Sequence, residues 1–416
     1  MHAWFAGLAT AARLEVRHAL RHPSILVICA LMPVFWCLLM AVTFGTGIMT
    51  KLPVGLVNED AGPLARETVM VLDAVPTMRL ESYETAAQAE DALRRGETYA
   101  TIVFPKHFTR DSLNGRGSTI ELLINKSYYS VSTFLEVDIK SALAAAQKSA
   151  GAERMTAARG GSFAANSRSL RVQAPEVDFI GNTAFNFNAY LLPTLIPGLL
   201  SIAAGVTFAG VLIREWRDGG SAELLDAVGG RAGAAVLGKL LPWVFWYILA
   251  TLCWMVGFSG LLGWPPAGSL LFWGVGGVLF ITAMAGITLM LCAYSLTWVI
   301  AVSGVMCMFA PSFPFTGFSY PFEAMTPGVV FWGHLLPVTH YLALQGECWV
   351  LASPVQTMME PLKTLTLLTV LPLAAGLPVM AHRLRKAARV ERKAADLLKA
   401  ARETGELPLP NEEGRA

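Results

Sequence analysis

One heptapeptide of this sequence matches the opening of a phosphate-binding loop. Residues Gly233 to Lys239 carry two glycines and a lysine at the spacing with which such a loop holds a nucleotide. The next residue is Leu240, whereas the loop needs a serine or threonine hydroxyl there to hold magnesium. No strand pattern precedes the segment, and an apolar run follows it. We therefore interpret the glycines as helix-packing residues and Lys239 as the edge of a membrane span. We expect this chain to bind no ATP, magnesium or other cofactor itself.

Two histidines are the other candidates for chemistry, as metal ligands or as acid–base groups. His334 and His340 are six residues apart with Pro337 between them, and Glu323 and Glu347 are the only acids nearby. This spacing does not gather the three or four ligands that a zinc site uses. The six cysteines form no CxxC motif or Cys/His cluster either. The sequence therefore predicts structural histidines, no metal site and no catalytic residue.

The elements that carry these residues are mostly apolar. Of the 416 residues 54% are hydrophobic and 15% are charged, whereas about a quarter are charged in a soluble domain. Residues 51–180 hold 31 of the 62 charged residues, and residues 240–322 hold none. One soluble-looking domain therefore lies within a chain that is otherwise membrane-like. The formal net charge of +2 excludes a strongly basic nucleic-acid-binding protein.

Apolar runs long enough to cross a bilayer, which takes about 20 residues, recur along the chain. We predict an α-helical membrane protein with six transmembrane helices. The spans are placed at residues 25–44, 190–213, 240–262 and 269–292, then from a weak break at 294–298 to about residue 309, and at 364–381. None contains Asp, Glu, Lys or Arg, although transporters driven by protons or ions need ionisable groups within the membrane. Any uphill transport would therefore take its energy from a partner.

The distribution of basic residues predicts the orientation of the spans. Lys and Arg gather before the first span, between the second and third, and after the last. The opposite segments, residues 263–268 and 311–362, contain neither. Because short cytoplasmic segments carry the excess of positive charge, we expect a multi-pass protein with both termini in the cytoplasm.

Residues 51–180 are predicted to form an extracytoplasmic α+β domain, inserted between the first two transmembrane helices. Strand patterns occur at residues 53–57, 78–83, 99–104 and 119–124, and helical patterns at 63–74, 84–95 and 130–158. The remaining divisions are residues 1–50, 181–382 with a cytoplasmic coupling segment at 214–239, and a cytoplasmic tail at 383–416.

Residues 1–50 combine an interfacial amphipathic helix with the first transmembrane helix. Apolar residues recur every fourth position, and arginines follow one position later: Trp4, Leu8, Ala12, Val16 and Leu20, then Arg13, Arg17 and Arg21. A basic amphipathic helix of this kind suits the headgroup plane of a lipid membrane. An ordinary cytosolic start to the first span is the alternative.

The segment after the second predicted span has the character of a docking element. Alternating charges at residues 214–218 precede the turn Gly219–Gly220, and Glu223 then stands beside Leu224 and Leu225. In the cleft of a partner the leucines would supply burial and the acids orientation. An ordinary charged loop between spans is the alternative.

This segment resembles the cytoplasmic coupling region of type 2 ABC-transporter permeases, whose pattern is roughly R-E-x-E-x-G-T-x-E-x-L-L with a later G-K. The matching residues are Arg214, Glu215, Gly219, Leu224, Leu225, Gly238 and Lys239. Arg217 replaces an acid, Gly220 replaces threonine, and Ala222 stands where glutamate is usual, with Glu223 one residue later. The resemblance implies a role in ATPase coupling for Arg214, Glu215, Gly219, Glu223, Leu224 and Leu225.

Other segments extend the resemblance over nearly the whole chain. Residues 52–60 look like the start of the outer domain in the long exporter subclass, and residues 185–199 like the entry into the second span. Residues 316–325 and 336–342 resemble the outer loop of the family and a following P-x-T-x-x-L element. By this resemblance we assign an extracytoplasmic gate to Phe318, Pro321, Glu323, Pro337 and His340.

The resemblance implies the permease subunit of an ATP-driven exporter in the bacterial cell inner membrane. Two permease subunits, identical or different, would pair and dock two cytosolic ABC ATPase subunits, which hold ATP and magnesium. An amphiphilic or drug-like substrate would leave the cytoplasm or the inner leaflet, and the outer domain could meet a periplasmic adaptor. No enzyme activity of this chain and no nucleic-acid partner are expected.

Two other classes of function stay open. A membrane sensor would bind a ligand with the outer domain, but residues 383–416 offer only a short basic helix and an acidic tail as an output domain. A membrane-embedded enzyme would use His334 or His340, with Glu323 as the attractive carboxylate.

Overall fold

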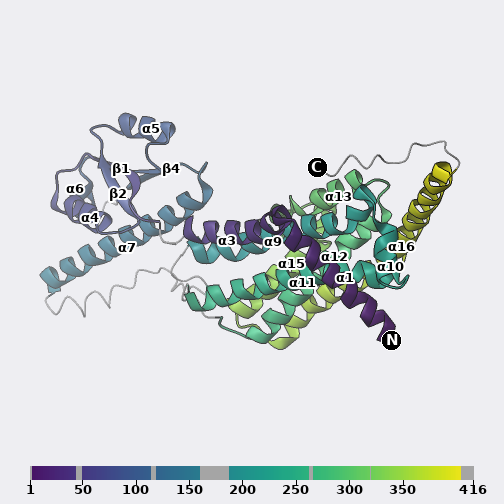
Figure 1. Ribbon diagram of the computed structural model, residues 1–416. Helices are drawn as coiled ribbons and strands as arrows, with labels where there is room; N and C mark the ends of the chain where they lie inside the picture. Colours follow the sequence, from purple (N-terminus) through teal and green to yellow (C-terminus); the bar gives the residue numbers. More distant parts are fainter. Residues whose placement is uncertain are drawn as a thin grey trace. The chain divides into compact units, whose positions relative to one another are not determined.

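In the computed structural model, the described residues are 2–43, 49–113, 119–159, 187–261, 266–318 and 320–403 (Figure 1). Two compact units make up the chain: Met1–Gly45 with Ala189–Ala416, and Thr46–Asn188. The predicted end of the outer domain, residue 180, lies outside the described residues, and the predicted boundaries stay predictions.

The unit Thr46–Asn188 contains a four-stranded mixed sheet in the order β2-β1-β3-β4. Its strands are β1 (Leu52–Asn58), β2 (Met78–Ser82), β3 (Ala100–Phe104) and β4 (Glu121–Ile124). Its helices are α4 (Pro63–Asp73), α5 (Ala86–Arg95), α6 (Phe108–Leu113) and α7 (Tyr129–Arg159). Strand β1 pairs in parallel with β2 and β3, so that Leu56 lies opposite both Ser82 and Ile102, and β4 is antiparallel to β3.

Helices cover both faces of this sheet. Val54 and Ile102 pack on one face against α4, α6 and α7, whereas Val57 and Val103 pack on the other against Ala89 of α5. All five residues of β3 are buried, as is typical of a central strand between two helical layers. The prediction of an α+β domain is not confirmed by this mixed sheet. Because α4 and α5 are crossover connections between parallel strands, most of the unit is of the α/β type.

The other unit is helical in the residues that the structure describes. Its helices are α1 (His2–Arg21), α2 (Pro23–Leu26), η1 (Val27–Leu31), α3 (Met32–Thr43), α9 (Phe187–Asp218), α10 (Ser221–Ala227), α11 (Ala232–Val256), η2 (Gly257–Leu261), α12 (Leu270–Tyr294), α13 (Trp298–Phe309), η3 (Phe313–Phe315), η4 (Phe322–Ala324), α14 (Pro327–His334), α15 (Pro337–Trp349) and α16 (Val355–Glu403). Helix α12 lies near its centre, where Phe280 stacks on Tyr341 of α15 and Trp273 donates a hydrogen bond to the Tyr341 hydroxyl.

Five helical segments of the described chain are long and apolar enough to cross a membrane. They are Pro23–Thr43, Leu191–Asp218, Ala232–Val256, Leu270–Tyr294 and Val355–Ala400. Large apolar side chains of Pro23–Thr43 are exposed, among them Leu38 at 60% and Val42 at 78%, which suits a lipid environment. The chain is thus a multi-pass α-helical membrane protein.

The fifth predicted span coincides with a shorter helix. Helix α13 has 12 residues, about 18 Å of helix, whereas the apolar core of a bilayer is about 30 Å thick. The short helices η3, η4, α14 and α15 follow it before α16 begins. The count of six spans therefore stays a prediction.

Candidate coupling site around α10

The predicted coupling segment forms a short helix between the ends of two long ones. Helix α9 ends at Asp218, and Gly219 and Gly220 follow with φ of +82° and +95°. These left-handed conformations reverse the chain and suit glycine, which has no Cβ to clash. Helix α10 then runs from Ser221 to Ala227, and α11 begins at Ala232. The heptapeptide that resembles a phosphate loop lies entirely within α11, so it is helix rather than loop.

One face of α10 is buried against the rest of the same chain. Leu224 and Leu225 are 8% and 5% exposed and belong to the main hydrophobic core, whereas Glu223, Asp226 and Ala227 are exposed. The expectation that the two leucines would be buried in a partner is therefore wrong. They fix α10 to the membrane unit, and the opposite face is the one left for a partner.

Four charged side chains form a buried cluster next to α10. Arg214 of α9 binds Glu15 of α1 through two hydrogen bonds of 3.0 and 2.6 Å, and it contacts Glu215 at 3.1 Å. Lys239 of α11 forms an ion pair with Glu215 and donates a 2.5 Å hydrogen bond to the Val211 carbonyl. Exposed fractions of these four side chains range from 1% for Glu15 to 19% for Arg214.

The cluster connects three helices through charges that balance. Two cations face two carboxylates, and the indole N–H of Trp243 donates a further hydrogen bond of 3.2 Å to Glu15. Removing one partner from such a buried pair leaves an uncompensated charge and costs about 3–5 kcal/mol. The ion pairs therefore hold α1, α9 and α11 together next to α10. Of the predicted site residues, Arg214 and Glu215 lie in this cluster.

Glu15 was not predicted as a site residue, and Lys239 was predicted as the edge of a span and as part of the family motif but not as a coupling residue. Glu15 is the sole acid among residues 1–50, and it lies in line with Gly7, Ala11 and Ala19 on the buried face of α1. A single acid in a row of small residues was the available signal.

The predicted apolar stripe of α1 is largely exposed. Trp4, Val16 and Leu20 are 37%, 43% and 65% exposed, which leaves them free to contact lipid.

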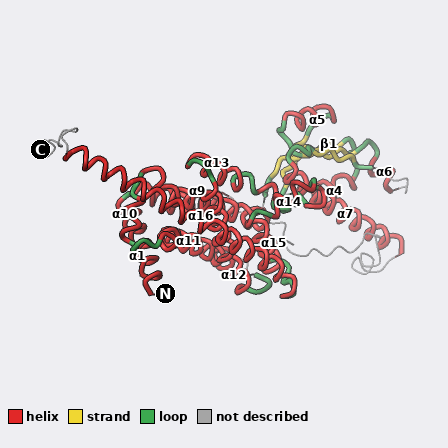
Figure 2. The backbone as a smooth tube through the Cα atoms, turned by 90° about the vertical axis from the view of Figure 1, so that its right-hand side faces the viewer, coloured by secondary structure: helices red, strands yellow, loops and turns green. Residues whose placement is uncertain are grey.

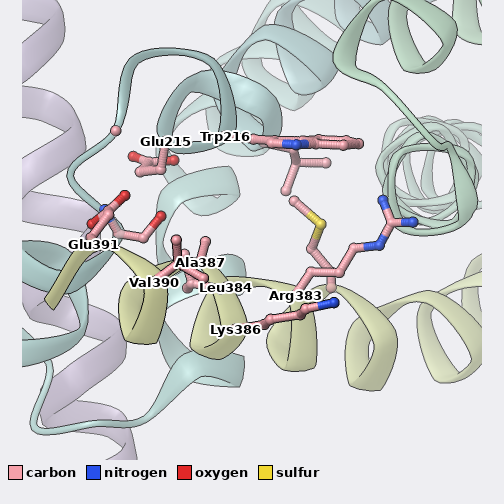
Figure 3. Close-up of a pocket in the computed structure, with 12 residues that line it drawn as sticks. Glu215, Trp216, Arg383, Leu384, Lys386, Ala387, Val390 and Glu391 are labelled. Carbon is pink, nitrogen blue, oxygen red and sulfur yellow. The ribbon is translucent and has the colours of Figure 1, made fainter. Parts of the chain in front are cut away.

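A cavity of about 460 Å³ separates the end of α9 from α16 (Figure 3). Glu215 and Trp216 lie on one side of it, and Arg383, Leu384 and Glu391 are on α16 across from them. The Arg383 guanidinium is 5.1 Å from the centre of a Trp216 ring, a cation–π contact. The volume falls in the range of small-molecule sites, about 300–1,000 Å³.

The predicted gate residues do not form one cluster. Phe318, Pro321 and Glu323 are exposed, whereas Pro337 begins α15 and is buried. His340 is 9% exposed and bonds through Nε2 to the His334 carbonyl oxygen at 2.8 Å. Burial lowers the pKa of His340, so its ring is kept neutral.

An aromatic stack lies where the gate was predicted. The ring of Phe322 stacks on His334 with centroids 4.9 Å apart, and His334 stacks on His340 at 5.7 Å. The described residues contain no group of three or more His, Cys, Asp or Glu side chains that could hold a metal ion. His334 thus lies between Phe322 and His340, and both histidines make packing contacts in the structure.

Comparison with known proteins places the chain in a family of transporters. Residues 23–377 match the model of a family described as ABC-2 family transporter protein. Two curated relatives carry the name "Probable multidrug ABC transporter permease YbhS", one from Escherichia coli strain K12 and one from Escherichia coli O157:H7. Each is 22% identical over 338 residues, which cover 79% of this chain and 84% of the relative. Because the family match spans most of its length, this chain belongs to the ABC-2 family and is a type 2 ABC-transporter permease.

Proposed function

We propose that this permease is the membrane subunit of an ATP-driven exporter and moves amphiphilic or drug-like molecules from the cytoplasm or the inner leaflet. The name of the Escherichia coli relatives supports the substrate class. The uncharged stretch 240–322 supports a pathway for apolar molecules, and it holds no carboxylate or basic amine for a proton relay. The energy then comes from cytosolic ABC ATPase subunits, which bind the ATP and magnesium.

The attachment of α10 is the observation that carries this proposal. Its exposed face, with Glu223, Asp226 and Ala227, contacts the ATPase, and its buried leucines transmit the contact to the membrane unit. When nucleotide binding draws the ATPases together, α10 moves. The cluster around Arg214 and Lys239 makes α1, α9 and α11 follow, because breaking any of its ion pairs is costly.

The arrangement in the membrane follows from the basic residues. Both termini and α10 lie in the cytoplasm of a bacterium, and the unit Thr46–Asn188 lies outside its inner membrane. Helix α13 adds a crossing to the five long apolar helices, and the short helices after it lie at the outer face. A second permease subunit, identical or different, closes the pathway, and the outer unit offers a surface for a periplasmic adaptor.

The outer end of the pathway is assigned to the segment from Phe318 to His340. The exposed residues Phe318, Pro321 and Glu323 face the exit, and the buried Pro337 and His340 support them through α15. The ring of Phe322 stacks on His334 and attaches the loop to the helices that follow it. The loop therefore moves as a rigid unit when the exit opens.

Charge reversal on α10 tests the proposal. The tagged permease and its ATPase are produced together, and ATP-dependent efflux of the fluorescent amphiphile ethidium is measured in cells. Glu223→Lys should abolish efflux and weaken co-purification of the ATPase, since the exposed face then carries a positive charge in place of a negative one. Glu360→Lys, an equally exposed acid near the start of α16, serves as the control and should change neither. Normal efflux with Glu223→Lys would remove α10 from the mechanism.

A further inference from the structure

Helix α10 lacks an N-terminal cap from its own neighbourhood and receives one from α16. Its N-cap residue, Gly220, has no side chain, so the first N–H groups of the helix have no local partner. The carboxylate of Glu391 accepts hydrogen bonds from the backbone N–H of Ser221 at 3.2 Å and of Ala222 at 2.7 Å. Figure 2 shows α10 beside α16 at this end of the helical unit.

The next residue of α16 holds the other end of α10. Arg392 donates a 2.5 Å hydrogen bond to Asp226. The pair is exposed, at 51% and 68%, and by itself contributes little to stability. Together with Glu391, however, it places contacts at both ends of a seven-residue helix. A movement of α10 along or across α16 would break one contact or the other unless α16 moved too.

The same stretch of α16 reaches a third part of the membrane unit. Arg383 donates a 2.5 Å hydrogen bond to the carbonyl oxygen of Ser295, the residue that ends α12 before α13 begins. Between Arg383 and Glu391 the helix spans about 12 Å. The last proline of α16, Pro378, precedes this stretch, so no proline kink interrupts it. Leu384 and Ala388, on the same stretch, are 9% and 1% exposed and keep it packed on the core.

The cavity beside this stretch gives it room to move. Its walls include Glu215 and Trp216 on the α9 side and Arg383 and Glu391 on the α16 side (Figure 3). A close-packed interface resists displacement, because every shift creates a clash or a void. The space of about 460 Å³ means that α16 and the end of α9 are not close-packed across it, so a small change in their separation there meets less steric resistance.

We propose that residues 383–392 of α16 form a cross-brace that carries the displacement of α10 to the turn between α12 and α13. Glu391 and Arg392 are positioning residues at one end, and Arg383 is the positioning residue at the other. The inference rests on the proposed function, because it takes α10 as the element that the ATPase moves. Through the cross-brace the ATPase acts on the turn between α12 and α13. This effect is separate from its effect on α1, α9 and α11 through the charged cluster.

A cysteine probe at the far end of the brace tests this inference. Leu296, next to Ser295, is 81% exposed, and Leu296→Cys in a background without the native cysteines offers a site for a water-soluble maleimide. The labelling rate is measured on the purified complex of permease and ATPase, with and without ATP. ATP should change the rate when the brace is intact. Glu391→Ala and Arg383→Gln should abolish that change while the ATPase stays bound.

Matched variants separate transmission from general damage. Asp396→Asn and Arg385→Gln alter exposed charges of α16 for which the described residues show no contact with α10 or Ser295, and they should keep the full ATP response. Glu391→Gln keeps an acceptor oxygen and should retain most of the response. Arg392→Asp should lose part of it, and the exchange Asp226→Arg with Arg392→Asp should restore that part.

The outcomes distinguish the inference from the proposed function. Failure of the wild-type permease to co-purify with an ABC ATPase contradicts the proposed function. A bound ATPase without any ATP response at Leu296→Cys overturns the cross-brace, as does an unchanged response in Glu391→Ala. Loss of the response in Asp396→Asn as well would also overturn it, because the effect would not belong to the contacts with α10.

Discussion

Lys239 of α11 and Glu215 of α9 form an ion pair with side chains only 4% and 10% exposed. The residues are 24 positions apart, at the two ends of the loop that carries α10. Whatever moves α10 therefore acts on two membrane helices that are joined by charge at the base of the loop.

Single substitutions in this pair should be more damaging than the double one. Lys239→Met leaves the buried Glu215 with Arg214 as its remaining cation and should cost up to about 3–5 kcal/mol, whereas Glu215→Gln with Lys239→Met removes both charges and should recover most of that loss. Thermal unfolding of the detergent-purified chain measures the effect. The exposed pair Arg217 and Asp218 is the control, because Arg217→Ala should cost at most about 1 kcal/mol. Equal stability of Lys239→Met and the wild type would show that the buried pair is not a structural link.

The packing of α1 on α11 should depend on one glycine. A Cβ at Gly238 would lie 2.5 Å from the Leu8 carbonyl oxygen and 2.7 Å from the Ala11 Cβ, so Gly238→Ala must push the helices apart. Gly233, in the same helix, has nothing within 4 Å of the corresponding position. Gly233→Ala should therefore leave stability unchanged or raise it by up to about 1 kcal/mol. Unfolding temperatures that fall equally for both variants would contradict the close contact.

Accessibility to a membrane-impermeant maleimide should divide the chain by side. Ser82→Cys, in the sheet unit, should react in intact cells, whereas Ala227→Cys, at the end of α10, should react only after the cells are opened. Both residues are exposed, so burial does not limit either reaction. Ser221 would be a poor choice, since it is 1% exposed. Labelling of Ala227→Cys from outside would reverse the proposed orientation.

The His340 ring should make the outer segment sensitive to acid. Its pKa is lowered by burial in the folded protein, so the unfolded chain takes up the proton more readily. Stability from this residue is complete above the ordinary histidine pKa of about 6.5 and declines as the pH falls toward the lowered value. Unfolding temperature measured from pH 7.5 to 5 should drop less in His340→Gln than in the wild type. His382→Gln, at an exposed position, should leave the profile as it is, and an unaltered profile in His340→Gln would refute the assignment.

The membrane helices were predictable because a bilayer demands a long apolar run, and composition alone reveals one. Helix α13 lies where the fifth span was predicted, but residues 240–322 contain no charge to mark where a helix leaves the membrane, so composition does not decide whether this short helix crosses it. The alternation of strand and helix between residues 52 and 104 already indicated parallel strands, since a helix between two strands acts as a crossover. The antiparallel pairing of β4 with β3 does not follow from that rule.

Contacts between residues that are far apart along the chain could not be predicted from the sequence. Arg214 is predictable as a site residue, but Glu15 is 199 positions away, and Glu391 is 170 positions from the helix end that it caps. Leu224 and Leu225 show the same limit, because two leucines in a short polar segment suit a partner's cleft and the chain's own core equally well. Only the packing of α10 on the membrane unit decides between them.

Site-specific cross-linking at Ala227 tests the central claim most directly. A photoreactive benzoylphenylalanine replaces this exposed residue of α10, and another replaces the exposed Glu360 near the start of α16 as the control. After illumination of cells that contain the permease and its ABC ATPase, position 227 should yield a covalent product with the ATPase, and position 360 should yield none. A product at neither position, with both chains present and the permease folded, would contradict the claim that α10 receives the energy for transport.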